Sequence, residues 1–128
     1  MNAIEKLKSV RNGLLKLHRE LIESERLVYE RSAGPIPSAG AFLQLLAHDP
    51  WFEWLRPSTA LIAKIDDALF DKKEPVTGEK AAGLLEEIRA LFSADPKDDG
   101  FGRSYAEVLQ RDPHVLATHA EVRRLLDG

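Results

Sequence analysis

The segment Asp49-Pro50-Trp51-Phe52-Glu53-Trp54-Leu55-Arg56-Pro57 decides which fold this chain is expected to adopt. It contains both tryptophans of the protein and one of its five phenylalanines, and two prolines bracket it. An aspartate before a proline can cap a helix, and proline fits the first helical position. We therefore expect a helix to begin here and to carry these aromatic side chains into a core or a binding surface.

The helical period continues beyond this aromatic segment. Apolar residues recur at spacings of three and four from Trp51 to Leu69. A proline inside a helix usually breaks or kinks it, because proline lacks an N–H and clashes with the preceding turn. The unbroken pattern predicts one helix over residues 50–71 that is bent or interrupted at Pro57. Trp51 and Leu55 lie on the apolar face of this helix, so we expect both in the core.

The rest of the chain reads as helices separated by turn signals. Residues 2–32 carry a broad apolar face, and Asn2 followed by Glu5 is typical of a helix start. Turn-forming residues are densest at 94–102. No segment alternates apolar and polar residues well enough to predict a strand. The predicted fold is therefore all-α, a four-helix bundle in a single domain over residues 1–128, with two short capping helices. The long helices are expected near 2–32, 50–71, 77–93 and 113–126, and the short ones near 38–48 and 103–111.

Composition limits the classes of function. The net charge is −3, and basic residues are interleaved with acidic ones, so we expect no nucleic-acid binding. The chain has no cysteine, which excludes disulfides, zinc–thiolate sites and thiol catalysis. No apolar segment approaches the length of a membrane span, and the first residues do not read as a signal peptide. We therefore expect a cytoplasmic protein that does not enter a membrane.

Residues that could carry catalysis or bind a metal are scattered. The candidate nitrogen ligands are His18, His48, His114 and His119, and none of them lies in a metal-binding motif. Paired carboxylates such as Asp66-Asp67 and Glu86-Glu87 do not face one another on a helix. We predict no catalytic residue, no metal site and no cofactor. A site assembled in space from several helices stays open, because the sequence does not reveal such convergence.

The aromatic segment and its neighbour supply the candidate binding residues, which are His48, Phe52, Trp54 and Arg56. Phe52 and Trp54 flank the predicted apolar face. Arg56 could stack on Phe52 or pair with Asp49. An exposed Trp-Phe-Arg cluster is typical of interface anchors, whereas a buried one would belong to the core. Both interpretations remain open at this point.

Several segments resemble a family of small all-helical bacterial proteins that share a DPWFxWLRP segment and have no assigned activity. The resemblance rests on Gly34-Pro35, Phe42-Leu43-Gln44-Leu45-Leu46, the aromatic segment, and Leu109-Gln110-Arg111-Asp112-Pro113. It covers most of the chain, and the aromatic segment is its most specific part. The resemblance implies an all-helical fold in a soluble bacterial protein and implies no activity.

Two classes of function follow from these observations. The leading hypothesis is a non-enzymatic helical bundle that binds another protein or a second copy of itself, as a homodimer. It would bind through the aromatic segment or through the far end of the long helix over residues 2–32. The alternative is a bundle, enzymes included, that binds a small molecule or metal between helices near His48 and the tryptophans. An exposed apolar patch would favour the first, and a buried pocket with converging polar groups the second.

Overall fold

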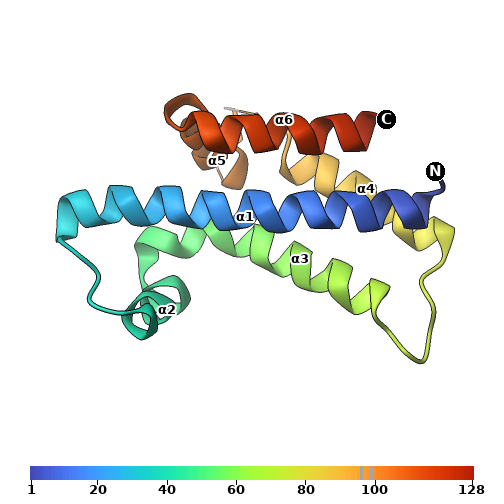
Figure 1. Cartoon of the computed structure of the whole chain (residues 1–128), viewed down its shortest axis with the longest axis horizontal. Coiled ribbons are helices and arrows are strands. Elements are labelled where there is room, and N and C mark those ends of the chain that lie inside the picture. Colours follow the sequence, from blue (N-terminus) through green and yellow to red (C-terminus); the bar gives the residue numbers. More distant parts are fainter. Residues whose placement is uncertain (96, 99) are drawn as a thin grey trace.

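The computed structural model describes residues 1–95, 97–98 and 100–128 (Figure 1). These residues form helices and no strand, so the predicted all-α class is confirmed. Pro96 and Asp99, which belong to the predicted turn at 94–102, lie outside the described residues. In chain order the elements are α1 (Ala3–Ala33), α2 (Ala39–His48), the 3-10 helix η1 (Pro50–Leu55), α3 (Arg56–Leu69), α4 (Gly78–Leu91), α5 (Phe101–Arg111) and α6 (Pro113–Asp127).

The helix ends follow local signals that the sequence already contains. Asn2 accepts a hydrogen bond from the Glu5 N–H at 2.9 Å, and Ser38 accepts one from the Ala41 N–H at 3.0 Å. These bonds satisfy N–H groups that a helix start leaves unpaired. Gly34 follows α1 with a φ of 88°, a left-handed conformation that glycine adopts without a steric penalty.

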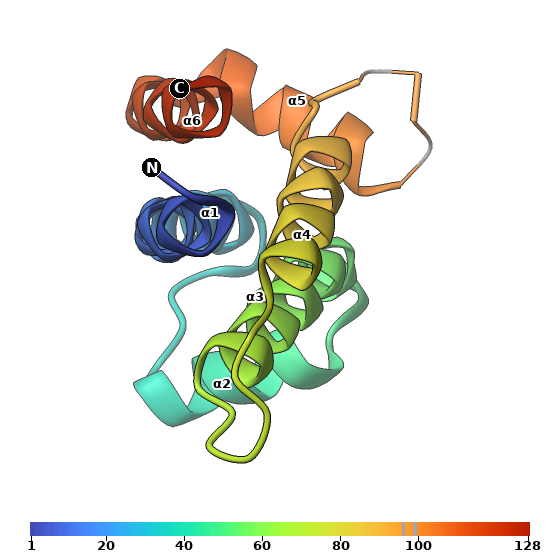
Figure 2. The same ribbon diagram turned by 90° about the vertical axis from the view of Figure 1, so that its right-hand side faces the viewer.

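α1 is the helix around which the others pack. In Figure 1, α6 and α3 lie on opposite sides of α1, and α4 contacts both α1 and α3. Figure 2 shows α6 stacked over α1, with α3 and α4 to one side of that pair. α5 packs on α6 and η1, while the main neighbour of α2 is η1. The arrangement is centred on α1, a detail that the predicted four-helix bundle did not contain.

One face of α1 supplies the centre of the core. Its leucines and valine at spacings of three and four are fully buried, namely Leu7, Val10, Leu14, Leu17 and Leu21. Truncating such a leucine to alanine typically costs about 2–5 kcal/mol. α1 is 31 residues long, but its outer faces are charged. Among the described residues, no helix combines the length and the hydropathy that a membrane span requires.

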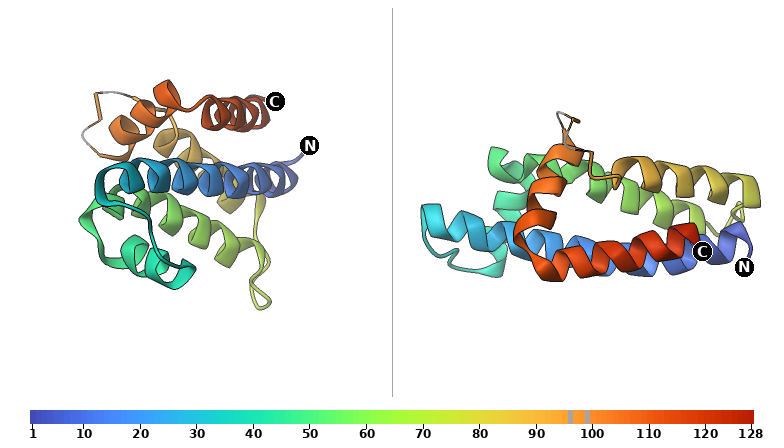
Figure 3. Two further views of the ribbon diagram at one scale, coloured as in Figure 1. Left: turned by 60° about the vertical axis from the view of Figure 1, so that its left-hand side comes forward. Right: turned by 90° about the horizontal axis from the view of Figure 1, so that it is seen from above.

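Gly13 explains how α6 approaches α1. Glycine weakens a helix by about 1 kcal/mol relative to alanine, so its place inside α1 needs a reason. A Cβ atom at Gly13 would lie 3.1 Å from Cγ2 of Val122 and 3.5 Å from Cδ1 of Leu125. The missing side chain therefore leaves room for α6. In the view from above in Figure 3, α6 runs along α1.

Candidate functional site

The aromatic segment forms a 3-10 helix, not the first turns of an α-helix. Asp49 caps it by accepting a hydrogen bond from the Trp51 N–H at 2.8 Å. Side chains three residues apart share a face in a 3-10 helix. Phe52 and Leu55 are therefore buried, at 1% and 3% exposure, while Trp51 is 38% exposed. The prediction for Leu55 is confirmed. The prediction for Trp51 is wrong because it assumed the α-helical period.

The predicted interruption near Pro57 is confirmed. The expected helix over residues 50–71 is divided into η1 and α3, and α3 ends at Leu69. Pro57 lies in the first turn of α3, where its missing N–H breaks no helical hydrogen bond. The change of helix type thus occurs just before the proline. As a result, Phe52 and not Trp51 lies on the buried side.

Phe52 and Trp54 hold different parts of the molecule together. Phe52 lies in the core, with its ring centroid 5.3 Å from that of Tyr29 and 5.7 Å from that of Phe42. Phe52 is 1% exposed, so the expectation that it only flanks the core is wrong. Trp54 is half-buried, and its ring lies 5.5 Å from the ring of Phe101 in α5. These two aromatic residues therefore do not form one exposed cluster.

His48 ends α2, and Arg56, the first residue of α3, reaches the C-terminal end of the same helix. The guanidinium of Arg56 donates to the backbone carbonyl of Ala47 at 2.8 Å and lies 3.6 Å from the carboxylate of Glu53. It therefore pairs with neither of the two partners expected from the sequence. His48 is exposed as the last residue of α2. Of the four predicted binding residues, Arg56 and Phe52 line the same groove, described below.

α2 combines an uncharged, apolar sequence with incomplete burial. Its ten residues, AGAFLQLLAH, include no Asp, Glu, Lys or Arg, although such residues make up 30% of the chain. None of the ten is buried, and Leu43 is 65% exposed. Phe42, Leu45 and Leu46 are half-buried against the core, so the uncovered apolar side chain of this helix is Leu43. An apolar side chain exposed on an uncharged helix is typical of a surface that binds something.

A groove of about 530 Å³ begins at this helix and runs between α2 and α3, with α1 at its floor. We call it the α2–α3 groove. Leu43 and Leu46 of α2 form one wall. Ala60 and Ala63 of α3 are part of the other wall, and His18 of α1 contributes a polar group to the floor. The lining is mainly apolar, and the small alanines leave space for an incoming side chain.

His18 is fixed by two hydroxyl groups of α3. Its Nδ1 lies 3.0 Å from Ser58 Oγ, and its Nε2 lies 3.3 Å from Thr59 Oγ1. Ser58 donates its one hydroxyl proton to the carbonyl of Leu55 at 3.0 Å, so His18 Nδ1–H donates to Ser58. Thr59 Oγ1 is within hydrogen-bond distance of both Nε2 of His18, at 3.3 Å, and the same Leu55 carbonyl, at 3.4 Å. Burial lowers the pKa of His18, which favours this neutral form.

This arrangement does not suit nucleophilic catalysis. A serine nucleophile must give its proton to the histidine, but Ser58 gives it to a backbone carbonyl. Ser58 is also fully buried, so no substrate can reach its hydroxyl. The His18–Ser58 contact therefore holds α1 against α3 and does not form a catalytic pair.

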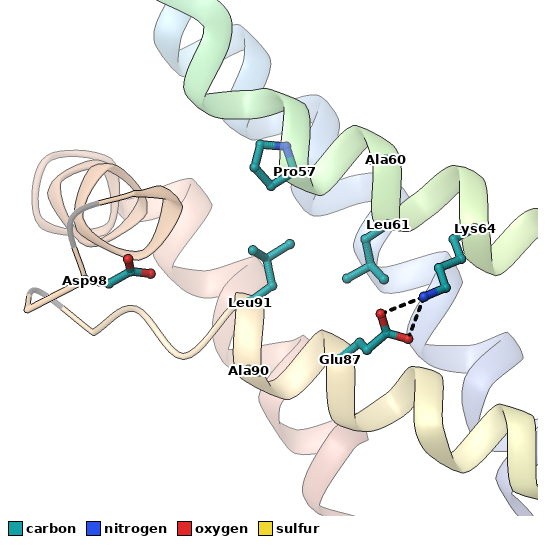
Figure 4. Close-up of a pocket in the computed structure, with 8 residues that line it drawn as sticks. All are labelled: Pro57, Ala60, Leu61, Lys64, Glu87, Ala90, Leu91 and Asp98. Carbon is teal, nitrogen blue, oxygen red and sulfur yellow. Dashed lines mark hydrogen bonds and ion pairs between the residues drawn. The ribbon is translucent and has the colours of Figure 1, made fainter.

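A second groove, of about 500 Å³, lies between α3 and α4. Figure 4 shows Leu61 and Leu91 at its centre, with the Lys64–Glu87 ion pair beside them at 2.9 Å. Asp98 lies at the other end, and its carboxylate accepts from the backbone N–H groups of Gly100 and of Gly102, the second residue of α5. Lys64 and Glu87 are thus paired with each other, whereas Asp98 is held by backbone N–H groups.

Glu25 is a buried polar residue that the sequence analysis missed. It is 6% exposed, and its carboxylate accepts from Trp51 Nε1 at 3.0 Å and from an Nη atom of Arg111 at 2.6 Å. Glu25 follows Leu21 by one helical turn, so its position on the apolar face was a signal of burial. Its partners could not be foreseen, because Arg111 lies 86 residues further along the chain.

Tyr105 and His119 form a separate pair. The Tyr105 hydroxyl lies 2.7 Å from Nδ1 of His119. Burial raises the pKa of Tyr105 well above its ordinary value, and burial together with the charge of Arg123 lowers the pKa of His119. Within the described residues, no three His, Asp or Glu side chains come together in a way that could hold a metal ion.

Comparison with known protein families, with curated proteins and with solved structures finds no match for this chain. The resemblance carried by the aromatic segment therefore stays a prediction, and the function must be argued from the site itself.

Proposed function

We propose that this protein acts without catalysis, by binding a protein partner through α2 and the α2–α3 groove. The observation that carries this proposal is the contrast within α2 between its apolar, uncharged sequence and its lack of buried residues. Each Å² of apolar surface that a partner removes from water contributes roughly 25 cal/mol to binding. Selection for solubility alone would favour charged residues at such positions.

The way α2 is held supports this proposal. A helix of ten residues is marginal by itself, and α2 depends on contacts at its two ends. Ser38 caps its start, and Arg56 binds the carbonyl of Ala47 near its end. The helix is thus presented in a fixed position, with Leu45 and Leu46 packed partly on the core and Leu43 left in solvent. A pre-organised apolar helix loses less conformational entropy on binding than a disordered segment would.

Site-specific photocrosslinking in cells tests the proposal. A benzoyl-phenylalanine at Leu43 should give a defined protein adduct on irradiation, because this side chain would lie inside the interface. The matched control is the same photoreactive residue at Phe70, which is 61% exposed at the far end of α3. Adducts at Leu43 no stronger than those at Phe70 would remove the basis of the proposal.

A small ligand in the α2–α3 groove is the second candidate function. The volume of about 530 Å³ and the polar floor at His18 favour it, because small-molecule sites share these features. A thermal-shift screen of metabolites tests this candidate, with Ala63→Trp as the variant that fills the groove. A ligand that raises the Tm of the wild type and not of the variant would support it, and no shift with any metabolite would reject it.

A further inference from the structure

We infer that the partner is a second copy of this chain, joined across a two-fold axis so that each α2 enters the α2–α3 groove of the other. This inference rests on the proposed function and identifies its partner. In this arrangement Leu43 of one copy lies against Ala60 and Ala63 of its partner, and the reverse contact forms at the same time.

The first argument is shape. A two-fold interface brings the same surface of both copies together, so the surface must contain both a projection and a matching hollow. Leu43 projects from α2, with 65% of its surface exposed. The α2–α3 groove opens directly beside it, and alanines on its far wall leave room for a leucine. Both complementary features are therefore adjacent on one face.

The second argument is charge. Two identical surfaces repel each other where they carry an unpaired charge near the axis. α2 has no Asp, Glu, Lys or Arg, and the guanidinium of Arg56 beside it is already bound to Ala47 and near Glu53. The contact surface is therefore neutral and can face itself without repulsion. A partner recognised through charged side chains would find no unpaired charge on α2.

The third argument is area. The chain exposes 7682 Å², whereas a compact monomer of 14.3 kDa exposes roughly 6,800 Å². The difference of roughly 900 Å² is close to the ~800 Å² that each partner buries in an interface of standard size. The surface in excess of a compact monomer is thus sufficient for one dimer contact.

Sedimentation equilibrium of the purified protein gives the first test. The expected result is a species of twice the 14.3 kDa chain mass, and Leu43→Asp should weaken its association at least about tenfold. Ala63→Arg should act in the same way from the opposite wall of the groove. Phe70→Asp, the matched control, should leave the association unchanged. Circular dichroism confirms that each variant is folded. A wild-type monomer up to the solubility limit, or a dimer that Leu43→Asp leaves intact, would overturn the inference.

Cross-linking gives the geometry, because the chain has no cysteine of its own. Leu43→Cys and Ala63→Cys variants of different tagged masses are mixed and treated with a short bismaleimide. The mixed dimer should cross-link, while Leu43→Cys with Ala82→Cys, an exposed position on α4, should not. No cross-link in the first mixture would refute this interface.

The photocrosslinking experiment at Leu43 separates the two proposals. An adduct of twice the chain mass supports both. Adducts of other masses together with a monomeric purified protein would refute self-association and leave partner binding in place. Absence of adducts above the Phe70 control, with a monomeric purified protein, would refute both.

Discussion

Replacing Trp51 and Phe52 in turn by glutamine tests the 3-10 geometry of the aromatic segment. The two residues are neighbours in sequence, but Phe52 is 1% exposed and Trp51 is 38% exposed. An α-helical period would place Trp51 on the buried side, and the 3-10 period places Phe52 there. With 3-10 geometry, Phe52→Gln should therefore cost more folding stability than Trp51→Gln. With α-helical geometry, Trp51→Gln should cost more.

The magnitudes follow from the surroundings of each ring. Phe52→Gln removes a buried aromatic ring that packs on Tyr29 and Phe42, and it introduces an amide without a partner. Losing the ring costs about 3–5 kcal/mol, and the unpaired amide adds about 1–3 kcal/mol. Trp51→Gln loses part of an exposed ring, and its amide N–H can still donate to Glu25, as Trp51 Nε1 does. We expect it to cost about 1–2 kcal/mol.

Urea unfolding followed by circular dichroism measures both values. Because the native state of such a domain is typically stable by about 5–15 kcal/mol, Phe52→Gln should remove a large part of it. Phe52→Leu is the milder variant, and it keeps the comparison measurable if the glutamine variant does not fold. A cost for Trp51→Gln equal to or above that for Phe52→Gln would refute the 3-10 assignment of the segment.

The remaining predictions concern the ion pairs and the histidines. Arg111→Met leaves the buried carboxylate of Glu25 with one partner and should lower the free energy of unfolding by about 2 kcal/mol. Lys64→Met, which removes an exposed ion pair, should change it by less than about 1 kcal/mol in the same denaturation assay. Burial lowers the pKa values of His18 and His119 below their ordinary value of 6.5, so the unfolded state binds protons first as the pH falls. Stability should therefore decrease as the pH drops through 6.5 towards the folded pKa values, and His18→Gln should reduce this slope in denaturation curves between pH 7 and pH 5.

The positions of the helices could be predicted because their signals are local. Asn2 and Ser38 cap helices in the structure as their sequence contexts indicate, and the apolar stripe of α1 is buried as its period requires. The placement of Trp51 could not be predicted in this way. A change from 3.6 to 3.0 residues per turn rotates each side chain by roughly 20° more, and apolar spacing over six residues does not distinguish the two periods.

The polar contacts between helices were beyond sequence reasoning for a different reason. Glu25 and Arg111 are distant in the chain, as are His18 and Ser58, and nothing local links the members of either pair. The apolar sequence of α2, by contrast, was visible from the start. Which of its side chains stay exposed is known only from the structure, which buries Phe42, Leu45 and Leu46 partly and leaves Leu43 in solvent.

One turn of α1 contacts the chain beside both of its Asp-Pro pairs, Asp49-Pro50 and Asp112-Pro113. Glu25 binds Trp51 after the first pair and Arg111 before the second. Ser24, also in α1, donates a hydrogen bond to Asp112 at the start of α6. Burial acts to raise the pKa of Asp112, but this bond and those from backbone N–H groups lower it overall. α1 thus reaches η1, α5 and α6 directly, whereas α2 is held chiefly through η1. Phe42, Leu45 and Leu46 of α2 pack partly on the core, whereas Leu43 is 65% exposed. The fold therefore does not account for this one apolar side chain, and the proposed contact with a second copy of the chain would.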